Sequence, residues 1–96
     1  MRRLGIVLAH GPESDEAQVA LELSRAAGAA GAAAYVFAMD AGVRAAGALV
    51  EVAAEVVVCG TSCERLGVTV PEGAVVGSQY DHAALVRGCE RVVALT

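Results

Sequence analysis

The sequence contains no lysine, no asparagine and no tryptophan, and it is poor in aromatic side chains. Its seven basic residues are all arginine, and eleven acidic residues leave a formal net charge of −4. Nucleic acids and anionic membrane surfaces attract basic proteins, so this balance disfavours both as partners. The missing lysine, together with the lack of a glycine-rich cradle, excludes a phosphate-binding loop, in which a lysine reaches the phosphates.

Long apolar runs are missing as well. Glu, Asp or Arg interrupts every apolar stretch before it reaches the length of a membrane span. The run at residues 4–9 is too short for the apolar part of a signal peptide, and no small-residue cleavage site follows it. We therefore expect a cytoplasmic protein whose three cysteines are free thiols and not a disulfide framework.

The abundant residues are small and apolar. Hydrophobic residues make up 56% of the chain and charged residues 19%, which is typical of a folded protein. The 96 residues suffice for a single domain, residues 1–96. Most apolar residues are Ala and Val, which bury little area each, so we expect a thin core. This predicts a homo-oligomer in which a neighbouring copy covers weakly polar helix faces.

Strand-like and helix-like segments alternate along the chain. Short Val-rich runs separated by helical stretches predict a parallel sheet with right-handed crossovers, in a flavodoxin- or Rossmann-like three-layer α/β/α sandwich. The expected strands are residues 4–9, 34–39, 55–59, 74–77 and 91–95. The expected helices run from a cap at Ser14 or Asp15 to about Ala30, over 43–53, over 63–66, and from a cap at Asp81 through Cys89.

The third strand ends on a cysteine and breaks at a glycine. Carboxyl ends of parallel strands are where ligands and reactive groups collect, which makes Cys59 a candidate nucleophile. Amide N–H groups of the turn at Gly60 and Thr61 would help its thiolate, and Arg65 would lower its pKa. Cys63, four residues on, is a candidate resolving or second sulfur-carrying thiol. The alternative is that Cys59 packs as a small hydrophobic residue.

The two histidines and the third cysteine complete the set of reactive side chains. His10 ends the first strand, so it is expected at the same sheet edge as Cys59, where an imidazolium would hold a thiolate. His82 is expected to be exposed and Cys89 to be buried rather than reactive. The spacing of these residues fits no standard zinc site, so we expect no metal and no cofactor.

Short segments resemble the DsrE/DsrF-like family, which includes TusD-type sulfur-relay subunits. The resemblance is carried by Cys59 with Arg65 and Gly67 behind it, by the segments 35–37 (YVF) and 40–43 (DAGV), and by 89–93 (CERVV). It implies a five-stranded parallel α/β/α sandwich assembled as a trimer or hexamer. It also implies that the cysteine at position 59 accepts persulfide sulfur and passes it to a partner protein.

Two functions from different classes follow. The first is a sulfur relay: Cys59 and Cys63 are the catalytic residues, Arg65, His10, Gly60 and Thr61 support them, and a sulfur donor protein and an acceptor protein are the partners. The second is a non-catalytic oligomeric scaffold or small-ligand binder in which the cysteines only pack. A redox switch between Cys59 and Cys63 is a third hypothesis.

Overall fold

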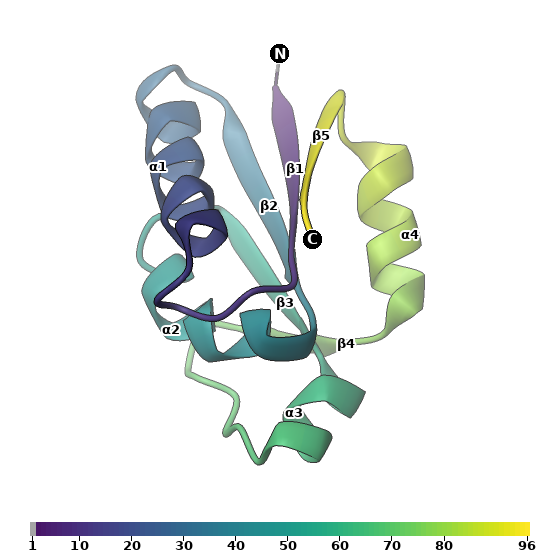
Figure 1. Cartoon of the computed structure of the whole chain (residues 1–96). Coiled ribbons are helices and arrows are strands. Elements are labelled where there is room, and N and C mark those ends of the chain that lie inside the picture. Colours follow the sequence, from purple (N-terminus) through teal and green to yellow (C-terminus); the bar gives the residue numbers. More distant parts are fainter. Residues whose placement is uncertain (1) are drawn as a thin grey trace.

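The computed structural model describes residues 2–96. The chain folds into a five-stranded, all-parallel sheet with strand order β4-β3-β2-β1-β5, with helices on both faces (Figure 1). The elements in chain order are β1 (Arg3–Leu8), α1 (Asp15–Ala29), β2 (Ala33–Ala38), the 3-10 helix η1 (Asp40–Ala45), α2 (Ala46–Leu49), β3 (Glu55–Cys59), α3 (Gly60–Leu66), β4 (Val75–Gly77), α4 (Gln79–Gly88) and β5 (Arg91–Leu95). The predicted three-layer α/β/α sandwich is therefore confirmed.

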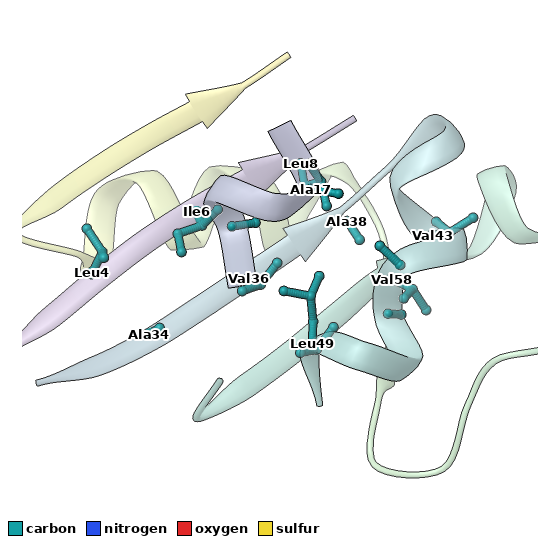
Figure 2. Close-up of a cluster of buried hydrophobic side chains, with 14 of the residues drawn as sticks. Leu4, Ile6, Leu8, Ala17, Ala34, Val36, Ala38, Val43, Leu49 and Val58 are labelled. Atoms are coloured by element: carbon teal, nitrogen blue, oxygen red, sulfur yellow. The ribbon is translucent and has the colours of Figure 1, made fainter. Parts of the chain in front are cut away.

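One face of the sheet carries most of the core. Because successive strand residues point to opposite faces, Leu4, Ile6 and Leu8 of β1 all face the layer of α1 and α2. Helix α1 meets them with the small residues Ala17 and Ala20, which allow close packing, and Figure 2 shows Ala17 against this cluster. α2 and η1 close the same layer with Leu49 and Val43.

The other face is covered by α4 and holds a smaller cluster. Val7, Phe37 and Cys59 are its buried members, and Met39, Val57 and Leu85 pack against them. A Cβ atom on Gly5 would lie only 2.6 Å from Leu85 Cδ2, so the glycine lets α4 approach β1 closely. Helix α4 has no fully buried residue, and large apolar side chains remain exposed on it and on the neighbouring β4: Val75, Val76, Tyr80 and Val86.

The helix predicted over residues 43–53 is wrong in type and length. The chain turns immediately after β2 into η1, and α2 has only four residues. The turn from β2 into η1 is tight because Asp40 has a positive φ of 50° and donates its N–H to Ser62 Oγ. The end is early because the N–H of Ala54 already donates to the Ala34 carbonyl, which aligns the chain for β3.

The predicted cap of α4 is also wrong. Ser78, not Asp81, is the N-cap: its hydroxyl accepts from the N–H of Tyr80, and the Asp81 carboxylate accepts from the N–H of Ser78 in return. This reciprocal capping box starts the helix at Gln79. Helix α3 likewise starts earlier than predicted, at Gly60, directly behind Cys59.

Across residues 2–96, none of the helices combines the length and the apolar character needed to cross a bilayer.

Candidate functional site

Cys59 is both the last residue of β3 and the N-cap of α3. Its backbone is extended (φ −68°, ψ 116°), and only 7% of the residue is exposed. In the sheet register Cys59 lies beside Gly77 of β4, and the preceding Val58 lies beside Ala38 of β2. The residues that follow β2 and β4 are therefore brought to Cys59 from both sides. The side chain belongs to the cluster on the α4 face.

The surroundings of Cys59 favour its ionised form. Burial alone raises the pKa of this thiol, but hydrogen bonding outweighs it, and the pKa of Cys59 lies below its ordinary value of 9.0. The donors are the Ser62 side chain, the backbone N–H groups of Ser62 and Thr61, and the Gln79 side chain.

Ser62 is fixed in its role by a second contact. Its oxygen accepts a 2.9 Å hydrogen bond from the N–H of Asp40, and only 4% of the residue is exposed. An accepted hydrogen bond leaves the hydroxyl hydrogen free to be donated elsewhere. Ser62 therefore links the turn after β2 to the start of α3, and its side chain is among the groups that lower the pKa of Cys59.

Helix α4 adds a polar group to the site from the opposite side. Gln79, its first residue, donates through Nε2 to Met39 Sδ at 3.8 Å, and its side chain is among the groups that lower the pKa of Cys59. The Oε1 atom of Gln79 is 2.9 Å from Nδ1 of His82. The His82 ring is stacked on Phe37, with 5.3 Å between ring centroids and 14° between ring planes.

Cys63 lies close to Cys59 in sequence but in a different environment. It is buried among the residues that face α1 and α2, whereas Cys59 packs on the α4 face. Burial raises the pKa of Cys63, and a charge on Cys59 raises it further. Cys59 is therefore the more acidic of the two thiols.

Two expected supports of Cys59 are engaged elsewhere. Arg65 pairs with Asp40 through a 2.9 Å contact between two exposed side chains, and it is not among the groups that lower the pKa of Cys59. His10 lies at the end of β1, where its Nε2 is 2.9 Å from the carbonyl oxygen of Thr96. The sequence predicted that His10 would lie near Cys59. Because β2 separates β1 from β3, the sheet does not bring the two side chains together. Gly60 and Thr61, by contrast, lie in the first turn behind Cys59.

Cys89 borders a cavity on the α4 face. The cavity has a volume of about 340 Å³, and Phe37, Val57 and Leu85, which pack around Cys59, form part of its wall. Cys59 itself is not in the lining. Burial raises the pKa of Cys89, although the charge of Arg3 opposes this. Cys89 is half-buried, and its raised pKa agrees with the expectation that it is not the reactive thiol.

Neither a family model nor a curated protein matches the sequence. The resemblance to the DsrE/DsrF-like family thus rests on the short motifs alone and stays a prediction.

Sequence reasoning did not find Ser62, Gln79 or Met39, and it placed His82 on the surface. His82 is half-buried against Phe37. A usable signal existed, since strands that are neighbours in a parallel sheet end at the same edge. Once β4 is placed next to β3, the first turn of the helix behind β4 must lie near Cys59.

Proposed function

We propose that the protein carries sulfane sulfur as a persulfide on Cys59. The observation that carries the proposal is the position of this sulfur: it lies at the end of β3 among four hydrogen-bond donors that lower the pKa of the thiol. A thiolate, not a thiol, is the nucleophile in sulfur chemistry. The motif resemblance to sulfur-relay proteins supports the same reading.

The chemistry needs no oxidant or cofactor. In loading, the Cys59 thiolate attacks the outer sulfur of a donor persulfide, forms a new S–S bond, and the donor's own S–S bond breaks to release the donor thiolate. In delivery, an acceptor thiolate attacks the outer sulfur of the Cys59 persulfide, and the Cys59 thiolate leaves. Both steps are thiol–disulfide-type exchanges in which a leaving thiolate of lower pKa departs faster.

Burial suits a carrier of this kind. Only 7% of Cys59 is exposed, and Phe37 and Val7 pack beside it, so a bound persulfide is shielded from water and from stray thiols. The exposed apolar residues of β4 and α4, Val75 and Tyr80 among them, support the homo-oligomer that the sequence predicts, because a second copy would cover them.

The test is intact mass spectrometry after incubation with inorganic polysulfide and removal of the excess. We expect the wild-type protein to gain the mass of one sulfur atom, which dithiothreitol removes. The gain should vanish in Cys59→Ser and persist in Cys63→Ser and Cys89→Ser, which are matched controls. A Cys59→Ser variant that loads like the wild type would show that Cys59 is not the carrier.

A second candidate, a small-ligand binder, is favoured by one observation. The cavity on the α4 face, at about 340 Å³, is within the size range of small-molecule sites, which begins at about 300 Å³. It combines the apolar Phe37 and Leu85 with the charged Arg3 and Glu55. A protein whose Cys59 gains no sulfur and is alkylated only after denaturation would favour this candidate over the carrier.

A further inference from the structure

The first turn of α4 carries two polar side chains, Gln79 and His82, that contact each other near the end of β3. Gln79 follows β4 closely, because Gly77 lies beside Cys59 in the register and Ser78 caps the helix. Its amide is held at both ends: Nε2 contacts Met39 Sδ, which packs in the cluster of Cys59, and Oε1 contacts His82 Nδ1. The Gln79 side chain is also among the groups that lower the pKa of Cys59. The arrangement is held by residues of three different strands and helices.

The contact to Met39 sets the orientation of the amide: a thioether sulfur only accepts hydrogen bonds, so the amide nitrogen lies on its side and Oε1 faces His82. A carbonyl oxygen only accepts hydrogen bonds, so Nδ1 of His82 carries the hydrogen and donates it to Gln79 Oε1. The same orientation turns the amide nitrogen of Gln79 toward Met39 Sδ, which packs in the cluster of Cys59. The reverse orientation would place a carbonyl oxygen against the lone pairs of Met39 Sδ and of an ionised Cys59.

Packing holds the imidazole in place. The His82 ring lies flat on Phe37, whose side chain is fully buried in the same cluster as Cys59. Stacking removes the freedom of the His82 side chain before it forms the hydrogen bond, so less entropy is lost on orienting Gln79. The chain of contacts runs from Phe37 through His82 and Gln79 to the sulfur.

We propose that Gln79 is a positioning residue for sulfur transfer at Cys59, and that His82 holds it in the orientation in which its amide donates to the sulfur. This inference rests on the proposed function, because it assigns a role within the same reaction. In loading, Gln79 holds the attacking thiolate; in delivery, it stabilises the thiolate that leaves Cys59 as the outer sulfur departs to the acceptor. No further reactant is involved.

The variants separate hydrogen bonding from packing. Gln79→Leu keeps the size of the side chain and removes the amide. His82→Phe keeps an aromatic ring on Phe37 and removes the Nδ1 donor, whereas His82→Asn loses the ring but offers an amide N–H near the same place. Ala83→Gln, at an exposed position of the same helix, is the matched control.

Two measurements report on these variants. The first is the ultraviolet absorbance of the thiolate against pH, taken in a Cys63→Ser/Cys89→Ser background so that Cys59 is the only thiol that titrates. The second is the rate of sulfur loading from inorganic polysulfide at neutral pH. Losing a hydrogen bond to a charged sulfur raises the pKa of the thiol and leaves about tenfold less thiolate at neutral pH. Nucleophilicity rises with the pKa, so each remaining thiolate reacts about threefold faster. The rate of loading should therefore fall roughly threefold.

We expect this loss in Gln79→Leu and His82→Phe, recovery in His82→Asn, and no change in Ala83→Gln. Nitrogen chemical shifts should also show His82 as the Nδ1–H tautomer. If the wild type loads sulfur but Gln79→Leu and His82→Phe titrate and load like it, the positioning role is refuted and the carrier stands. If neither the wild type nor any variant gains sulfur on Cys59, the proposed carrier function is refuted. If the thiolate titration curves of the wild type and the variants are also the same, the positioning role of Gln79 is refuted as well.

Discussion

Replacing Ser62 with alanine should weaken both the fold and the thiolate. The hydroxyl of Ser62 is the partner of the Asp40 N–H at 2.9 Å, and its side chain also lowers the pKa of Cys59. A polar group left without a partner inside a protein costs about 1–3 kcal/mol. Because Asp40 is an exposed residue and its hydrogen bond is only partly buried, water reaches the orphaned amide, and we expect the lower part of that range, about 1–2 kcal/mol.

The midpoint of thermal unfolding converts this figure into a measurable change. For a domain of this size about 1 kcal/mol corresponds to about 4–8 °C, so Ser62→Ala should melt roughly 5–15 °C below the wild type. The loss should also depend on pH. The folded pKa of Cys59 is below its ordinary value of 9.0, so the stability that Cys59 contributes is present above pH 9.0 and is lost as pH falls through the folded pKa.

Ser62→Ala raises the folded pKa of Cys59 and so removes part of that contribution. The destabilisation should therefore grow as pH rises from 6 toward 9, which urea unfolding at several pH values can measure. Thr61→Ala is the matched control, because Thr61 acts on Cys59 only through its backbone N–H and its side chain is exposed. A Ser62→Ala variant with the thiolate titration of the wild type would refute the role of the hydroxyl.

Two further predictions concern the scaffold. A Cβ atom on Gly42 would collide with the carbonyl oxygen of Leu8, backbone against backbone, so Gly42→Ala should cost about 2–3 kcal/mol in urea unfolding. Gly47→Ala, with no atom within 4 Å of the added Cβ, should be neutral or stabilising by up to about 1 kcal/mol, and equal losses in both would contradict the packing argument. The N–H of Arg2 holds the pKa of Glu90 below its ordinary value of 4.5, so this carboxylate stabilises the fold above pH 4.5 and loses its contribution as pH falls. Glu90→Gln should therefore lower the free energy of unfolding at neutral pH and make it depend less on pH in the acid range. An acid-unfolding curve identical to that of the wild type would contradict this role of Glu90.

The strands and their order of appearance could be predicted because they depend on local sequence. Parallel strands buried on both faces are short, continuous Val-rich runs, and the limits predicted for β3 and β5 agree with the structure. The segment after β2 could not be predicted in the same way. Its 3-10 geometry depends on the Ser62 hydroxyl, 22 residues away, and on the approach of Gly42 to Leu8. Neither contact leaves a periodic trace in the sequence.

The candidate site was predictable at its centre and not at its edges. Cys59 was found because a strand that ends on cysteine and breaks at glycine is a local pattern. His82 was misplaced because a cap at Asp81 sets it at the very start of a helix. With Ser78 as the cap, His82, Leu85 and Cys89 form a half-buried row that faces the sheet. Arg65 was assigned to the thiol from proximity in sequence, whereas Asp40, on another element, pairs with it.

The three cysteines together are the strongest argument for a carrier over a scaffold. All three are free and at least partly buried, so packing alone would leave them alike. Burial raises the pKa of Cys63 and of Cys89, and it would do the same at Cys59, but Ser62 and the first amides of α3, with Gln79, outweigh it there. A packing cysteine has no use for donors aimed at its sulfur, because a neutral thiol is a weak acceptor. A sulfur that must be a thiolate before loading and again after delivery uses them in both steps.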